Sequence, residues 1–226
     1  KKIDWKRHML KEPRERVRVL SSTEESNLFE QLRPDYQSVV QFALLTGCRL
    51  CEIVPGKHYP GLKWKDVDWA ARTITVLGKG GHVGTIPISK GVRELLFPLQ
   101  GHHDEYVFTY VCQRADAGRV RGHRYPMTRE GLKTEWRRAK LDANLLDYRF
   151  HDNRHTAATA VLRATGNLKI VQKLLRHSDV TTTAKYAHAL ADDVRAAMES
   201  AEEFRTKSRT SAEDAAKGAK IKGEIG

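Results

Sequence analysis

The N-terminal third of the chain places its apolar side chains at helical spacing. A helix from Asp35 to Gly47 is predicted because its apolar residues recur every three or four positions, at Val39, Val40, Ala43 and Leu44. Upstream, residues 22–25 read Ser-Thr-Glu-Glu, an N-cap followed by two carboxylates in the first turn. This pattern predicts a preceding helix that ends near Leu32.

After Gly47 the spacing of apolar residues changes. A short helix over 49–53 and a loop over 55–61, rich in Pro and Gly, come first. Apolar and polar residues then alternate with a period of two, which predicts three antiparallel strands at 64–69, 73–77 and 83–88. Residues 78–81, Gly-Lys-Gly-Gly, form the turn between the last two strands.

Helical spacing returns at Ser89 and continues toward the C-terminus. The predicted helices lie at 89–97, 128–143, 151–165, 168–175, 180–187 and 192–204. The fold is therefore expected to be α+β, mostly α-helical, with one small three-stranded antiparallel sheet. A basic arm over 1–20 precedes the domain over 21–191, and a C-terminal helix with a disordered tail follows over 192–226.

Charge and composition narrow the classes of partner and of cellular location that fit the chain. The chain has 226 residues, with 40 Lys and Arg against 28 Asp and Glu, so its formal net charge is +12. A surplus of Lys and Arg suits a phosphate backbone, which makes nucleic acid the first partner to consider. No apolar run reaches the ~18–20 residues of a membrane-spanning helix, and three cysteines cannot form a disulfide framework. We therefore expect a cytoplasmic protein with no membrane partner.

Two pairs of potential metal ligands occur. Cys48 and Cys51 form a C-x-x-C, but a structural zinc site needs four ligands and the third cysteine stands alone. His151 and His155 would share one face of a helix, as in zinc hydrolases, but an Asp stands where a Glu is expected and an Arg lies between them. Residues 78–81 lack the order of a nucleotide-binding P-loop. No metal and no cofactor is therefore expected.

Five short motifs follow one another in a fixed order. They are T-G-C-R-L-C-E at 46–52, G-K-G at 78–80, H-D-N-R-H-T at 151–156, H-S at 177–178 and T-T-A-K-Y-A-H at 182–188. Each alone has a structural interpretation, such as an Arg49–Glu52 ion pair or Tyr186 as a core aromatic. In this order they closely resemble the catalytic domain of the tyrosine recombinases, the phage integrase family, from about Arg18 to Ala191.

The resemblance implies roles in phosphodiester cleavage. Tyr186 would be the nucleophile that bonds covalently to the phosphate. Arg49 and Arg154 would stabilise the transition state by gripping the nonbridging oxygens, because a guanidinium makes bidentate contacts that an ammonium cannot. His177 would add a further donor to those oxygens.

Three other residues would complete the site by resemblance. Lys79, on the turn between two strands, would act as general acid and protonate the 5′-hydroxyl leaving group. His151 would assist as general base. Glu52, one helical turn after Arg49, would support the site by orienting the arginines.

The resemblance also implies a reaction and its partners. The enzyme would be a site-specific recombinase that cuts and rejoins double-stranded DNA through a 3′-phosphotyrosine intermediate, without metal or ATP. The helix over 192–204 resembles the segment by which family members self-associate on DNA, although it could also fold back in cis. Members usually carry an N-terminal core-binding domain as well, so we expect a catalytic fragment of a nucleoid-associated bacterial or phage-encoded protein.

The sequence departs from the family pattern at three places. An extra loop, 54–61, separates Glu52 from the first strand, and we expect it to bulge into solvent. Arg176 stands where a glycine commonly precedes His177, in a left-handed turn that costs a non-glycine residue about 1 kcal/mol; a phosphate contact could compensate. Asn153 replaces a usually apolar residue, which nothing in the sequence explains.

Two other functions fit the same residues. A type IB topoisomerase would use the same catalytic groups to cut and reseal one strand without exchange. A DNA-binding protein without catalysis would use the arginines as phosphate contacts only. A covalent protein–DNA adduct that disappears in Tyr186→Phe would distinguish catalysis from binding.

Overall fold

The first two helices begin and end where local signals predict. α1 covers Ser22–Gln31, and the side chains of Ser21 and Glu24 each bond the other's backbone N–H, at 3.3 and 2.9 Å, in a capping box. α2 covers Pro34–Thr46, with proline in its first turn, and Gly47 ends it at φ +63°. The computed structural model describes residues 17–115, 118–177, 179, 181–187, 193–195, 198–199 and 201–202.

The described residues divide into two compact units. The first unit holds the residues up to Ala158 together with Leu174–Arg176, and the second holds Thr159–Lys173 and the residues from His177 onward. Most of the predicted arm over 1–20 and the end of the predicted tail over 192–226 lie outside the described residues. Among the described residues, no helix combines the length and the apolar character that crossing a bilayer requires.

In the first unit, α3 and an exposed loop follow α2. α3 covers Leu50–Ile53 and begins directly after Arg49, its N-cap residue. The backbones of Gly56 and Tyr59 exchange hydrogen bonds of 2.9 and 3.2 Å, so the extra loop closes on itself. Residues 56–58 are exposed at its tip.

A three-stranded antiparallel sheet follows, in the order β1-β2-β3. Its strands are β1 Val67–Asp68, β2 Thr73–Leu77 and β3 Val83–Pro87. The 3-10 turn η3, Lys79–Gly81, joins β2 to β3. The prediction of a strand over 64–69 was wrong for its first half. There the side chain of Asp66 accepts a hydrogen bond from the Lys63 N–H at 3.1 Å and closes a 3-10 turn, η2 Trp64–Asp66.

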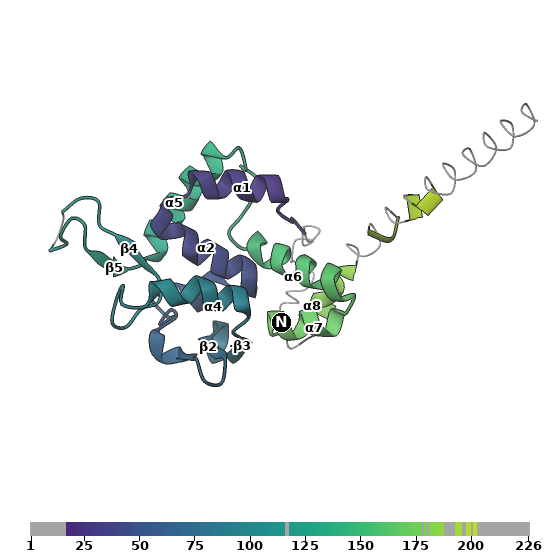
Figure 1. Cartoon of the computed structure of the whole chain (residues 1–226), viewed down its shortest axis with the longest axis horizontal. Helices are drawn as coiled ribbons and strands as arrows, with labels where there is room; N and C mark the ends of the chain where they lie inside the picture. The colour runs from purple at the N-terminus through teal and green to yellow at the C-terminus, as the bar shows by residue number, and fades with distance from the viewer. Residues whose placement is uncertain are drawn as a thin grey trace, which may run out of the picture. The chain divides into compact units, whose positions relative to one another are not determined.

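Helix α4, Lys90–Leu96, packs along α2, and α5, Arg129–Asp142, packs along α1 (Figure 1). Between α4 and α5 a two-stranded sheet projects from the unit, formed by β4 Thr109–Val111 and β5 Arg124–Pro126. The prediction of a single sheet was wrong here. Strands of three residues are too short to show a period of two in the sequence.

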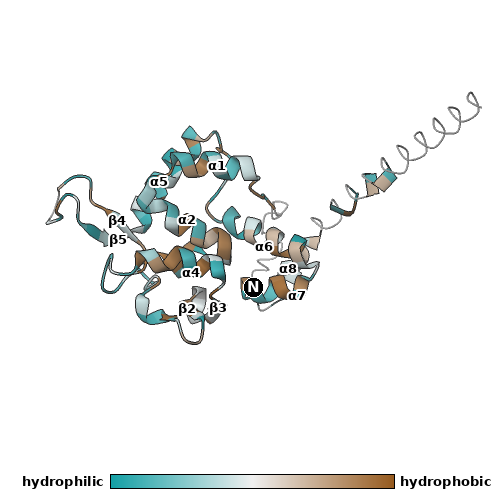
Figure 2. Ribbon diagram, viewed as in Figure 1, coloured by the Kyte–Doolittle hydropathy of each residue, from teal (hydrophilic) through white to brown (hydrophobic). Residues whose placement is uncertain are grey.

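Apolar side chains of α2 form the centre of the first unit. Val39, Val40, Phe42 and Ala43 are fully buried. The Phe42 ring lies 5.3 Å from that of Phe108, between centroids. Figure 2 shows the apolar residues concentrated in α2 and α4. The predicted mostly helical α+β class with a three-stranded antiparallel sheet is confirmed.

Two helices, α6 and α7, each contribute residues to both units. α6 covers Asp152–Thr165 and α7 covers Leu168–Leu175, both at their predicted bounds within one residue. α8 covers only Thr181–Ala184 of the predicted 180–187. The Tyr186 N–H donates to the carbonyl of Thr183 at 3.1 Å, and this tighter turn ends the helix early. Of the predicted helix over 192–204, residues 193–195, 198–199 and 201–202 are described, and they are helical.

Candidate active site

Arg49 is held at the turn between α2 and α3 by one carboxylate. Its Nη1 donates to Oε1 of Glu52 at 2.9 Å, and its backbone N–H donates to Oε2 at 2.8 Å. The Glu52 side chain is 2% exposed, whereas that of Arg49 is 34% exposed. The carboxylate therefore lies inside the protein and presents the arginine toward solvent.

A second guanidinium reaches the same carboxylate. Nη2 of Arg176 lies 2.7 Å from Oε2 of Glu52, and Nη1 donates to the carbonyl of Leu174 at 2.9 Å. Burial alone would raise the pKa of Glu52, but the charge of Arg176 and the bonds from Arg49 outweigh it and hold that pKa below its usual value. Glu52 is therefore ionised at neutral pH and bridges two arginines.

The backbone of Arg176 adopts the left-handed conformation that the sequence predicts. Its φ is +54°, in the region that favours glycine. Its side chain crosses β3 at Gly84, where a Cβ atom would lie 2.4 Å from Cδ of Arg176. A protein carboxylate, Glu52, thus provides the contact that the sequence led us to expect from a phosphate.

Arg154 enters from α6 and is almost fully buried, at 2% exposure. Its guanidinium donates to the carbonyls of Gly47 and Leu175, the groups at the C-terminal ends of α2 and α7. A cation is favourable there because helix C-termini carry partial negative charge. Arg154 therefore bonds the same turn from which Arg49 projects.

The turn between β2 and β3 lies beside Glu52. A Cβ atom on Gly78 would be 3.3 Å from Oε1 of Glu52, and the Gly78 N–H donates to the carbonyl of His82 at 2.7 Å. The backbone of Lys79 follows directly, while its side chain lies outside the described part of the chain. The structure thus brings the Lys79 segment to the arginine cluster.

His151 stands exposed just before α6, one turn from Arg154. Its ring packs edge-on against that of His155, with centroids 5.6 Å apart, and His155 is buried. The described residues hold no group of three His, Cys, Asp or Glu side chains that could bind a metal. Burial raises the pKa of the Cys48 thiol to about 11, so this cysteine is protonated at neutral pH.

The remaining two predicted residues lie in the second unit, where Thr183 links them. Nδ1 of His177 lies 2.9 Å from Oγ1 of Thr183. Tyr186 is 1% exposed, and its N–H bonds the Thr183 carbonyl. Nζ of Lys185 lies 5.5 Å from the centre of the Tyr186 ring.

Sequence reasoning missed two contacts in these groups. The Arg176–Glu52 ion pair had one visible signal, an arginine where a glycine is common. The Thr183–His177 bond had none, because a threonine in a T-T-x-x-Y motif is equally compatible with an exposed helix.

Comparison with known proteins identifies the family. The model of the phage integrase family matches residues 15–193. The chain belongs to this family. The integrase of Salmonella phage P22 is 27% identical over 179 residues, which cover 76% of this chain and 44% of that protein. The tyrosine recombinase XerC of Staphylococcus aureus is 29% identical over 189 residues, which cover 80% of this chain and 57% of that protein. The chain thus spans about half the length of these relatives.

Solved structures of family members share the fold. The XerA recombinase matches with a TM-score of 0.54 at 24% identity, over 77% of this chain and 63% of that one. The Tn1549 transposon integrase, solved with transposon right-end DNA, matches with a TM-score of 0.57 at 22% identity, over 84% and 67%. The predicted tyrosine recombinase fold is therefore confirmed.

Proposed function

We propose that this chain is the catalytic part of a site-specific recombinase, which cuts and rejoins double-stranded DNA through a 3′-phosphotyrosine bond at Tyr186. The observation that carries the proposal is the pairing of a buried, ionised Glu52 with an outward-facing Arg49. An arginine held rigidly and still one-third exposed is prepared to bind an oxyanion without reorganisation.

Arg49 and Arg154 bind the nonbridging oxygens of the scissile phosphate in this proposal. Among the described residues only Nη1 of the Arg49 guanidinium has a partner, so Nη2 and Nε remain for a phosphate. Arg154 carries its positive charge at the same turn, next to Gly47. Together they stabilise the charge that develops as the phosphorus becomes pentavalent.

The covalent step forms one bond and breaks one. The phenol oxygen of Tyr186 attacks phosphorus, and the phenol proton passes to His151 as general base. The bond to the 5′ oxygen breaks, and Lys79 donates a proton to that oxygen. His177 donates a hydrogen bond to a nonbridging oxygen. The tyrosyl ester retains the energy of the original bond, so a 5′-hydroxyl of another strand can reverse the step without ATP.

The C-terminal helix over 192–204 is proposed to pack against a neighbouring protomer on DNA. Val194 and Met198 are four residues apart, which places them on one helix face, and they are 57% and 59% exposed. Asp193 pairs with Arg163 at 2.9 Å and ties the start of this segment to α6. The division into an arm over 1–20, a catalytic domain over 21–191 and a tail over 192–226 stays a prediction, as does action at the bacterial nucleoid.

A trapping experiment tests the proposal. The protein is incubated, with EDTA present, with a library of nicked duplexes whose centres are randomised, so that cleavage releases a short strand and prevents religation. We expect an adduct that resists denaturant, that is absent with Tyr186→Phe, and that persists with Tyr106→Phe as the matched control. Tyr106 is half-buried and lies in the loop before β4. Binding without any adduct would favour a non-catalytic DNA-binding protein.

A further inference from the structure

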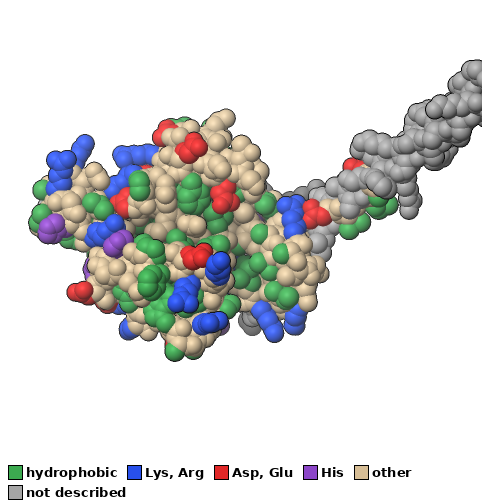
Figure 3. Space-filling view, in the orientation of Figure 1, with side chains coloured by type: hydrophobic (Ala, Val, Ile, Leu, Met, Phe, Trp, Pro, Cys, Tyr) green, Lys and Arg blue, Asp and Glu red, His purple; other side chains and the backbone are tan. Residues whose placement is uncertain are grey.

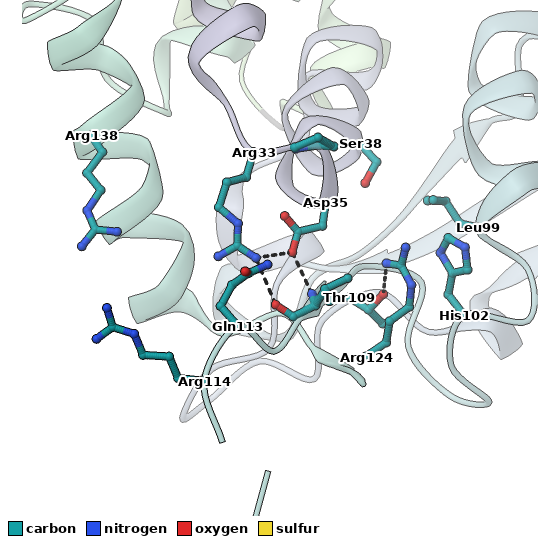
Figure 4. Close-up of a pocket in the computed structure, with 12 residues that line it drawn as sticks. Arg33, Asp35, Ser38, Leu99, His102, Thr109, Gln113, Arg114, Arg124 and Arg138 are labelled. Atoms are coloured by element: carbon teal, nitrogen blue, oxygen red, sulfur yellow. Dashed lines mark hydrogen bonds and ion pairs between the residues drawn. The ribbon is translucent and has the colours of Figure 1, made fainter. Parts of the chain in front are cut away.

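A pocket of about 920 Å³ opens at the N-terminal end of α2, within the first unit (Figure 4). It is lined by α2, by α5 and by the chain around β4 and β5. Its charged and titratable lining residues are Arg33, Asp35, His102, Arg114, Arg124 and Arg138. No site residue proposed above belongs to this pocket.

Most of the positive charge in the pocket is not neutralised. Arg33 pairs with Asp35 at 2.6 Å, and Asp35 also accepts from the Val111 N–H at 2.7 Å. Arg124 donates to a neutral partner, Oγ1 of Thr109, at 3.3 Å. Within the described part of the chain, the guanidiniums of Arg114 and Arg138 have no hydrogen-bond or ion-pair partner, and both residues are exposed. The pocket therefore carries three guanidiniums, those of Arg114, Arg124 and Arg138, that have no carboxylate partner among the described residues.

The electrostatics of His102 agree with this excess of positive charge. Burial and then the nearby charge of Arg124 lower the pKa of its imidazole. In Figure 4 the guanidiniums of Arg138 and Arg114 come from separate elements toward the same opening. An anion bound between them would be contacted from both sides.

The shape and surroundings of the pocket indicate a nucleic acid backbone. The pocket is open, and the exposed residues Arg119, Arg121 and His123 extend its positive surface along the loop between β4 and β5. Figure 3 shows Lys, Arg and His side chains at this end of the unit. Protein interfaces are usually anchored by large aromatic or apolar side chains, whereas nine of the twelve residues that line this pocket are polar or charged.

The separation of the pocket from Arg49 fits the spacing of a duplex. The two lie at opposite ends of α2, whose 13 residues span ~20 Å at 1.5 Å per residue. Phosphates follow one strand of DNA at about 3.4 Å per base pair, so ~20 Å corresponds to roughly six base pairs. One duplex can therefore reach both ends of α2.

We propose that this pocket binds backbone phosphates of the DNA substrate about six base pairs from the scissile phosphate, with Arg114 and Arg138 as the principal contacts. The inference rests on the proposed function, because it assumes that the phosphate cleaved lies at Arg49. The pocket contributes to the affinity for DNA and to the register of the protein on the duplex, and it takes no part in the chemical step.

Salt dependence of DNA binding tests the pocket independently of cleavage. The full chain carrying Tyr186→Phe is titrated with a 30-base-pair duplex between about 50 and 250 mM KCl. Each phosphate contact contributes about 0.9 to the slope of log K against log salt concentration. Arg114→Gln with Arg138→Gln should therefore reduce the slope by about 1.8 and the affinity at 150 mM salt by more than about tenfold.

A matched double variant controls for lost charge alone. Arg72→Gln with Arg93→Gln removes two exposed arginines outside the pocket and should change the slope by less than about 0.5. Both double variants should keep the thermal midpoint of the parent. An equal slope change in the two double variants would overturn the proposal. So would a loss of poly-L-glutamate binding as large as the loss of DNA binding, because the pocket would then serve an acidic protein.

The two proposals fail separately. A reduced slope in the pocket variant, together with no adduct from the chain with Tyr186 intact, would leave the pocket standing and reject the proposed cleavage. An adduct with an unchanged slope would reject the pocket and leave cleavage standing.

Discussion

The two ends of α2 present arginines in opposite ways. At the C-terminal end Arg49 and Arg176 are both bonded to the buried carboxylate of Glu52. At the N-terminal end Arg114 and Arg138 stand exposed, with no ion-pair partner in the described part of the chain. Arginine is therefore held by a carboxylate at one end of α2 and is exposed without such a partner at the other.

The difference corresponds to two physical tasks. Stabilising a transition state requires donors that are oriented before the reaction, because reorganising them would consume the free energy they supply. Holding a polyanion requires only positive charge near phosphates, and mobile side chains serve well. We therefore expect substitutions at the C-terminal end to change rates and those at the N-terminal end to change affinity.

Replacing arginine by lysine should separate the two ends most strongly. In Arg49→Lys the charge is kept, but the fork that contacts both Glu52 and a phosphate is lost, so the rate of adduct formation should fall about 100- to 1,000-fold. In Arg138→Lys the rate should fall less than about threefold, because a point charge still attracts phosphate. Single-turnover rates with saturating trapping substrate measure both. Similar losses in the two variants would contradict the distinction.

Glu52 should make stability depend on pH. A carboxyl whose pKa is lowered in the folded protein stabilises it fully above its unfolded pKa, about 4.5, and loses this contribution as the pH falls through the folded pKa. Urea unfolding should show Glu52→Gln less stable by about 3 kcal/mol at pH 7, and the gap should close below pH 4.5. A gap independent of pH between 3 and 7 would show that Glu52 is not the ionised bridge.

Arg176→Gly should reduce the rate while leaving stability nearly unchanged. The glycine relieves the backbone strain of the left-handed conformation, about 1 kcal/mol. It also removes one guanidinium from Glu52. These effects on stability oppose each other, whereas Arg49 loses part of its support. We expect adduct formation about tenfold slower, partly rescued by Arg176→Lys, with DNA affinity unchanged. A loss of stability in proportion to the loss of rate would indicate a merely structural role.

Gly84→Ala gives a smaller perturbation of the same network. The added methyl would meet Cδ of Arg176 at 2.4 Å and displace that side chain from Glu52. We expect the rate to fall about threefold, and the same substitution to be silent when Arg176→Gly is already present. Additive effects in the double variant would mean that Gly84 acts by another route.

Sequence reasoning reached the fold class and most helices because their signals are local. The residues that cap α1 and α2, and the apolar residues that set the spacing of α6 and α7, lie within one or two helical turns of one another in the sequence. It failed for β4 and β5, which are held by pairing between strands too short to show a period. It also failed at Trp64–Asp66, where one side-chain bond replaced a strand by a turn.

For the candidate site, the sequence predicted which residues belong to it better than it predicted the contacts between them. Arg49 and Glu52 are three residues apart, so their ion pair follows from helical spacing. The partner of Arg176 lies 124 residues away, and no local pattern can reveal it. The basic pocket likewise assembles from three separate elements, and the net charge of +12 indicated only that some part of the surface suits a phosphate backbone.

The most direct test of the proposed covalent step is to locate the bond that it forms. The trapped adduct is digested with nuclease and trypsin, and the peptides are analysed by mass spectrometry. Trypsin cuts after Lys185, so we predict a nucleotide attached to Tyr186 in the peptide Tyr186–Arg195. A nucleotide on any other tyrosine, or on a serine, would contradict the role proposed for Tyr186.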